Sequence, residues 1–222
     1  MEPAPRQSLD PVPADPGNTQ AWYDSASGLY ARFAARLKYP PTRKAIEALD
    51  LVGTERVVDL GCGPGHAVVD LGSRLDEGSV IGVDFAPGMC REARDAIEQT
   101  GVGDAAGVVC GDVTALPLST DSVDVALSSF VIDLLRPADI DAALEEIRRI
   151  VDPHGRVTIV SLADSDSLPT TAYRTLRKLF RTQLDCRPLP VTALLETHDF
   201  DIEVEQEHAL YGLPVTVAIA GL

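Results

Sequence analysis

The stretch VVDLGCGPGHA, residues 57–67, decides the fold. An apolar run ends in Asp59, and glycines then stand at every second position, at Gly61, Gly63 and Gly65. The apolar run is typical of a buried strand. Glycine permits positive φ angles and lets a ligand touch the backbone, and the N-terminus of a following helix offers unpaired N–H groups. The stretch therefore predicts a strand, a tight turn and a helix, with a nucleotide-like ligand at the turn.

Strands and helices continue to alternate after this turn. The runs RVVDL, SVIGVDF, AGVVCGDV, SVDVALSSFV and GRVTIVSL are typical of strands, and helical patterns follow most of them. Strands that are apolar on both faces and alternate with helices indicate a parallel sheet covered on two sides. The last two strands, DIEVEQEHAL and PVTVAIAGL, are joined by a short segment and predict an antiparallel hairpin. We expect an α/β, Rossmann-like, doubly wound, mostly parallel seven-stranded sheet with an antiparallel C-terminal hairpin.

Three segments are expected along the chain. Residues 1–18 hold five of the sixteen prolines and predict a disordered or loosely attached arm. Residues 19–54 predict a helical cap made of two helices, with a break near residues 27–28 and with Pro41 near the start of the second helix. Residues 55–222 form the predicted ligand-binding domain.

Charge and composition narrow the class of protein. The 222 residues include 19 basic and 34 acidic ones, giving a net charge of −15, and only three of the basic residues are lysines. Such a surface suits either a high-salt cytoplasm or an ordinary acidic protein, and the dependence of stability on salt would decide between them. The charge argues against non-specific binding of nucleic acid, which needs a basic surface.

Other sequence signals are weak or missing. No apolar run reaches the roughly 20 residues of a membrane helix, and the N-terminus lacks the apolar core of a signal peptide, so we expect a cytoplasmic protein. The four cysteines form no CxxC pair, which favours reduced thiols over disulfides or a zinc site. We therefore expect no metal.

Acidic residues end the next two predicted strands. Asp84 stands 19 residues after Gly65, where a carboxylate can accept hydrogen bonds from two ribose hydroxyls. Asp112 ends the third strand, where it can accept a hydrogen bond from an adenine amino group or cap a turn. The glycine spacing G-x-G-x-G differs from the G-x-G-x-x-G of dinucleotide enzymes, which weakens a nicotinamide interpretation.

These motifs together resemble those of a known family. VVDLGCGPG, VIGVDFAPGMCREAR, GDVTALPLSTDSVDVALSSFVI and LEEIRRIVDPHGRVTIV are similar, in order and spacing, to motifs of the class I S-adenosylmethionine (SAM)-dependent methyltransferases. The subgroup that the chain resembles is the small-molecule branch that includes the menaquinone and ubiquinone C-methyltransferases. The resemblance covers about residues 55–162, nearly half of the chain.

The resemblance implies which residues bind SAM. It places Phe85, Met89, Asp112 and Val113 around the adenine and Asp84 at the ribose. It places Gly61, Cys62 and Gly63 along the methionine, and Ser128 and Ser129 near the methyl group. Asp59 would order the loop or reach the methionine amino group through water. The family's N-terminal lid makes Tyr23 and Tyr30 further candidates.

The methyl acceptor is the less visible half of the site. Methyl transfer from a sulfonium is an in-line displacement, and a weakly acidic acceptor also needs a base. Asp133 is the best-placed base, although a helix-flanking or solvated role is favoured, so no catalytic residue is assigned. His198 and His208 are expected to be structural, and His66 to lie near the cofactor.

A basic helix follows the last quoted motif. Basic residues at Arg174, Arg177, Lys178 and Arg181 share one predicted face, with Tyr173, Leu176, Phe180 and Leu184 on the opposite, buried face. A solvated surface is favoured over recruitment of an anionic substrate or a membrane.

The expected function is methyl transfer from SAM to a small-molecule acceptor, with S-adenosylhomocysteine (SAH) as the second product. A nicotinamide-dependent oxidoreductase and a SAM-binding protein without catalytic activity are the alternatives. The acceptor, the methylated atom and the oligomeric state, a homodimer included, stay open.

Overall fold

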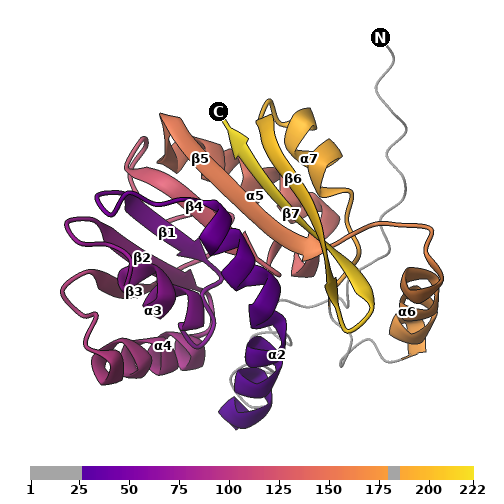
Figure 1. Cartoon of the computed structure of the whole chain (residues 1–222), viewed down its shortest axis with the longest axis horizontal. Coiled ribbons are helices and arrows are strands. Elements are labelled where there is room, and N and C mark those ends of the chain that lie inside the picture. The colour runs from indigo at the N-terminus through magenta and orange to yellow at the C-terminus, as the bar shows by residue number, and fades with distance from the viewer. Residues whose placement is uncertain (1–26, 180–185) are drawn as a thin grey trace.

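A seven-stranded sheet forms the centre of the protein (Figure 1). The computed structural model describes residues 27–179 and 186–222. The strand order is β3-β2-β1-β4-β5-β7-β6, and β7 runs opposite to the other six strands of this sheet. The strands are β1 (Arg56–Leu60), β2 (Ser79–Asp84), β3 (Ala106–Cys110), β4 (Val123–Ser129), β5 (Val151–Leu162), β6 (Asp201–Leu210) and β7 (Leu213–Gly221). The predicted fold class is therefore confirmed.

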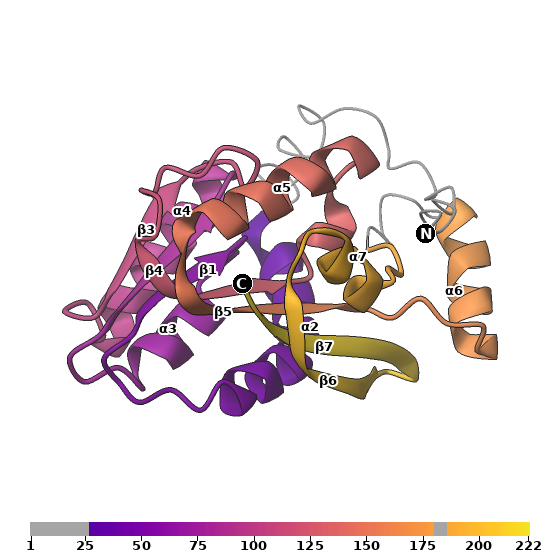
Figure 2. The same cartoon turned by 90° about the horizontal axis from the view of Figure 1, so that it is seen from above.

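Helices cover both faces of the sheet. One face carries α2 (Ser27–Ala48), α3 (His66–Gly72) and α4 (Pro87–Thr100), and the other carries α5 (Pro137–Ile150) and α7 (Val191–Thr197). Figure 2 shows α5 and α7 across the sheet from α2 and α3, with α6 (Leu168–Leu179) beyond the end of β5. A single 3₁₀ turn, η1 (Ile132–Leu134), follows β4.

Side chains of β1 alternate between two hydrophobic cores. Val58 and Leu60 pack with α5, whereas Val57 packs with α2 and α3. Successive strand residues point to opposite faces, so Asp59 lies on the same face as Val57. Each core buries Val, Ile and Leu side chains, and this burial is the main force that holds the layers together.

The cap helix departs from the prediction. α2 is one helix over Ser27–Ala48, with Pro40 and Pro41 inside it, so the expected second helix starting at Pro41 is wrong. Proline removes a helical hydrogen bond and usually ends or kinks a helix. Here the turn that follows is held by the core, where Ile46 and Leu49 are almost fully buried. Tertiary packing therefore outweighs the local cost.

Two connections add detail to the sheet. β5 begins at Val151, directly after α5, four residues earlier than expected, and a register irregularity between Val123 and Val125 of β4 accommodates the extra residues. The C-terminal hairpin turns at Tyr211 and Gly212, which have φ values of 51° and 82°. Two consecutive positive φ angles are the signature of the tight turn that joins antiparallel strands.

Candidate functional site

The three glycines after β1 serve three different purposes. All have positive φ, at 68° for Gly61, 52° for Gly63 and 86° for Gly65. A Cβ on Gly61 would lie 2.2 Å from Val131, and one on Gly65 would lie 2.9 Å from the backbone of Ala93 in α4. A Cβ on Gly63 would meet nothing within 4 Å. Of the three, only Gly63 has open space at the position of a side chain, where a ligand can approach. The lack of a side chain at Gly61 and Gly65 allows close packing.

Asp84 lies directly beside this open backbone. Its Oδ2 accepts a hydrogen bond of 2.9 Å from the Gly63 N–H, and its Oδ1 accepts one of 2.9 Å from the Ala86 N–H. The turn itself is tied to β2, because the N–H groups of Gly61 and Cys62 both donate to the Val83 carbonyl. The carboxylate is buried.

Asp59 lies beneath the turn in an apolar setting. It is 2% exposed, and burial, with a further contribution from the Asp84 charge, raises the pKa of its carboxyl to about 8. Its Oδ2 has no hydrogen-bond partner among the described residues. Burial likewise raises the pKa of the Cys62 thiol well above its ordinary value, so this thiol is neutral. A cationic group of a ligand that reaches Asp59 would therefore lie beside an acidic side chain.

The next two strand ends carry the residues expected around adenine. Phe85 is 41% exposed, whereas Met89 is buried against Ala86. Asp112 is exposed, and its Oδ1 accepts hydrogen bonds from both the N–H and the hydroxyl of Thr114, at 2.9 and 2.8 Å. Asp112 thus does cap a turn, through one oxygen. Val113 is buried in the core.

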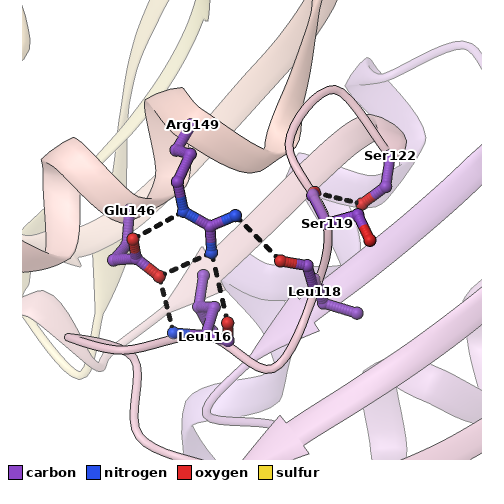
Figure 3. A network of polar contacts seen from close by, with 6 residues as sticks. All are labelled: Leu116, Leu118, Ser119, Ser122, Glu146 and Arg149. Carbon is purple, nitrogen blue, oxygen red and sulfur yellow. Dashed lines mark hydrogen bonds and ion pairs between the residues drawn. The ribbon is translucent and has the colours of Figure 1, made fainter.

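A polar network anchors the loop that carries Asp112 and Val113 (Figure 3). Glu146 of α5 accepts a 2.7 Å hydrogen bond from the Leu116 N–H and a bidentate pair from Arg149, which lowers the pKa of the Glu146 carboxyl. Arg149 also donates to the carbonyls of Leu116 and Leu118. Helix α5 therefore fixes residues 116–118, just after the loop passes the predicted adenine position.

The end of β4 lies against the cap helix. The Ser129 and Thr42 hydroxyls are 2.6 Å apart, which joins the strand end to α2. Ser128 points to the other core, and its buried Oγ has no hydrogen-bond partner among the described residues. Phe130 follows with a φ of 55°, a conformation that non-glycine residues rarely adopt and that is common at functional sites.

Helix α2 also supplies contacts that the sequence did not indicate. The Tyr39 hydroxyl donates to Asp70, and burial raises its pKa, while the Tyr39 ring lies 5.8 Å from the His66 ring. Lys38 Nζ lies 2.9 Å from Cys186 Sγ. The residues that contact the site from this helix thus include Lys38, Tyr39 and Thr42. Of the predicted lid residues, Tyr23 lies outside the described residues and the side chain of Tyr30 is not described.

Asp133 lies in the 3₁₀ turn η1 and is fully buried, so of the two roles favoured for it, helix-flanking or solvated, the solvated one is wrong. Its Oδ2 accepts a 3.2 Å hydrogen bond from the Ser161 hydroxyl at the end of β5. His198 and His208, expected to be structural, lie in α7's C-terminal cap and in β6. His198 Nδ1 lies 2.9 Å from the Leu194 carbonyl, and burial lowers the pKa of His208.

The basic face of α6 also differs from the prediction. Arg177 is buried, at 6% exposure, whereas Leu176, expected in the core, is 48% exposed. Arg174 is paired with Asp164 of the preceding segment. The side chain of Lys178 is not described, and Arg181 lies outside the described residues. The helix is therefore rotated relative to the predicted arrangement, and it does not present Arg177 to solvent.

Neither a metal cluster nor a membrane helix is found where the structure can be described. Among residues 27–179 and 186–222, no group of three His, Cys, Asp or Glu side chains could hold a metal ion. No helix in the same ranges is both long and apolar enough to cross a membrane.

Comparison with known proteins shows what the chain is similar to. Residues 57–155 match the family described as "Methyltransferase domain". The chain is 31% identical over 191 residues to malonyl-[acyl-carrier protein] O-methyltransferase from Methylovorus sp. (strain MP688), and this alignment covers 83% of this chain and 60% of that protein. Both matches agree with the resemblance of the motifs to those of SAM-dependent methyltransferases.

Two further proteins are similar to this chain. Demethylmenaquinone methyltransferase from Roseiflexus castenholzii is 33% identical over 108 residues, covering 49% of this chain and 43% of that protein. The crystal structure of magnesium protoporphyrin IX methyltransferase from Synechocystis PCC 6803, with bound SAH, superposes with a TM-score of 0.74 at 15% identity. That alignment covers 93% of this chain and 99% of the other.

These comparisons support SAM as the cofactor of this chain. The curated relatives are also longer than the part matched here. The chain spans 60% of the Methylovorus protein and 43% of the Roseiflexus protein.

Proposed function

We propose that this chain transfers a methyl group from SAM to a small-molecule acceptor and releases SAH. The observation that carries the proposal is the open backbone at Gly63, held 2.9 Å from the buried carboxylate of Asp84 at the edge where the parallel strands end. That edge is where ligands bind in open α/β sheets. A pyrophosphate would need a different glycine spacing, whereas SAM carries no phosphate.

The residues present fit SAM along its whole length. Asp84 would accept hydrogen bonds from the ribose hydroxyls, and Phe85 and Met89 would border the adenine. Asp112 keeps a second carboxylate oxygen beside its turn hydrogen bonds, and this oxygen would accept the adenine amine. Val113 would line the edge of the ring.

The methionine half of SAM would lie on the glycine turn. The backbone at Gly61, Cys62 and Gly63 would pack against it, and Asp59 would face its ammonium group directly or through water. Asp59 Oδ2, which is buried and has no hydrogen-bond partner among the described residues, is consistent with a polar ligand at the turn.

Bound SAM supplies an electrophilic methyl group on a sulfonium. The chain's own contribution is to align the acceptor for an in-line displacement and to keep water out. Ser129 lies at the end of β4, where its hydrogen bond to Thr42 holds α2 over the reacting region. Asp133 lies behind this region and is held by Ser161. The proposal assigns neither residue as a general base.

The acceptor class follows from the relatives. Those named above are malonyl-[acyl-carrier protein] and demethylmenaquinone methyltransferases, so we extend a small organic acceptor group to this chain. The net charge of −15 argues against a nucleic-acid acceptor. We also propose a cytoplasmic enzyme, a loosely attached arm at 1–18, a helical cap at 19–54 and a SAM-binding domain at 55–222. Whether it forms a homodimer can be measured by analytical ultracentrifugation.

Two measurements test the proposed function. Isothermal titration of the full chain with SAM, SAH and NAD should show saturable binding of SAM and SAH only. SAH release should then be followed with a panel of small carboxylic, phenolic and quinol acceptors. Binding of NAD alone would support the oxidoreductase alternative. SAM binding without turnover of any acceptor would support a binding protein.

A further inference from the structure

A mostly buried arginine lies on the inward face of α6. Arg177 is 6% exposed, and among residues 27–179 and 186–222 its Nε has no hydrogen-bond partner and its guanidinium has no ion pair. Arg174, three residues earlier on the same helix, does have an acidic partner in Asp164. Because burying a charge without an opposite charge is unfavourable, an anionic ligand that pairs with Arg177 would relieve this cost.

A continuous series of contacts joins α6 to the methyl-transfer region. From the end of β4, Ser129 contacts Thr42, and one turn earlier on α2 Lys38 contacts the Cys186 thiol at 2.9 Å. The Cys186 carbonyl accepts a 2.9 Å hydrogen bond from Tyr173 of α6. Residues four apart lie on the same side of a helix, so Arg177 stands one turn beyond Tyr173 on this face.

Further positive charge gathers along the same series. Arg187 is 2% exposed and donates a 2.6 Å hydrogen bond to the Leu135 carbonyl, and Lys38 lies 5.7 Å from the centre of the Phe130 ring. Lys38 and Arg187 thus lie beside the contacts of Cys186 that link α2 to α6, in a chain whose net charge is −15. A local concentration of cations in such a protein attracts an anion.

We propose that the methyl acceptor carries an anionic group, a carboxylate or a phosphate, which Arg177 binds at a distance from the methylated atom. This inference rests on the proposed function and names the class of its substrate. The planar guanidinium offers paired N–H donors that match two oxygens of either group. Arg177 is then a residue that binds and orients the substrate, and the acceptor extends from the end of β4 toward α6.

The test measures anion binding to the SAH-bound full chain at constant ionic strength. The probes are malonate, inorganic phosphate and, as an uncharged control, malonamide. Wild-type protein should bind malonate or phosphate saturably and should not bind malonamide, and the preferred anion identifies the group. Arg177→Gln should weaken that binding at least tenfold. Arg177→Lys keeps the charge but loses the paired N–H donors of the guanidinium, so its affinity for the anion should lie between those of wild type and Arg177→Gln. The matched control Arg174→Gln should stay within twofold of wild type.

The outcomes separate this inference from a structural role. Equal binding by wild type and Arg177→Gln, or binding of malonamide as tight as malonate, would overturn it. Arg177→Met without ligand should melt at the same temperature as wild type or higher, because it removes an uncompensated buried charge. A large fall in melting temperature with unchanged anion binding would make Arg177 a structural residue. Failure of SAH itself to bind would instead contradict the proposed function.

Discussion

The two halves of the candidate site are built in different ways. At the cofactor edge, Gly63 and Asp84 meet across 21 residues, within one strand–helix–strand unit. At the acceptor edge, Ser129 meets Thr42 across 87 residues, and Lys38 meets Cys186 across 148. The first edge depends on backbone groups and the second on side chains from distant segments. The proposed cofactor edge is therefore a local product of the fold, whereas the proposed acceptor edge depends on how the cap helix and α6 pack.

The largest effect is expected from closing the open backbone at the cofactor edge. Gly63→Val would place a side chain where nothing now lies within 4 Å, so SAM affinity should fall by about 100-fold or more. Gly101→Val is the matched control, since Gly101 also has positive φ and open space but lies at the end of α4. Both variants should lose about 1–2 kcal/mol of stability from the left-handed backbone. Equal SAM affinity in the two variants, measured by titration calorimetry, would contradict the assignment.

A second prediction concerns the buried carboxyl under the turn. Asp59 has a folded-state pKa of about 8, above its ordinary value of about 4, so the folded protein keeps a proton that the unfolded chain releases. The stability of the ligand-free protein should therefore fall as pH rises from about 4 to about 8, by at most about 1.4 kcal/mol per pH unit. Asp59→Asn should remove this dependence, and the exposed control Asp95→Asn should keep it. Urea denaturation at pH 6 and pH 8 measures the free energy of unfolding of each variant. An equal change in this free energy between the two pH values for Asp59→Asn and wild type would show that Asp59 is ionised.

The anchoring network behind the adenine position should have a smaller effect. Glu146→Ala removes the acceptor of the Leu116 N–H and two hydrogen bonds of Arg149, which should cost about 1–3 kcal/mol of stability. SAM affinity should weaken by only a few-fold, because no contact to SAM is assigned to Glu146. Glu145→Ala removes a neighbouring, exposed carboxylate and should change neither quantity. A similar loss in both variants would mean that helix charge, and not the network, is responsible.

The smallest effect is expected at the acceptor edge. Thr42→Val keeps the shape of the side chain but leaves Ser129 without this hydroxyl partner, so kcat should fall by about 3- to 10-fold with SAM affinity unchanged. Thr100→Val is a suitable control. The hydroxyls of Thr42 and Thr100 each donate a hydrogen bond to the carbonyl four residues earlier, Thr42 on α2 and Thr100 on α4. A change in SAM affinity, with kcat unaffected, would place Thr42 at the cofactor edge instead.

The order of strands and helices could be predicted because it depends on local patterns. Apolar runs, the glycine turn, Asp84 at the end of β2 and Asp112 two residues after β3 all lie within short windows, and the family motifs follow the same order. The predicted strands match the sheet, and α4 has the predicted bounds of residues 87–100. The continuous α2 could not be predicted, since proline is a local signal for a helix end and the core contacts that override it are distant.

What the sequence by itself determined is the fold and the cofactor edge, where Gly63, Asp84 and the strand ends lie close together because one strand–turn–helix unit brings them there. Only the tertiary structure decided which glycines allow close packing and which one faces open space. It also decided that Asp133 is buried and that Arg177 lies on the inward side of its helix. Each of these depends on contacts with residues far away in the chain, such as Val131 against Gly61 and Ser161 beside Asp133. A sequence pattern indicates the period of a helix or strand. Which face of that element is buried depends on the residues that pack against it.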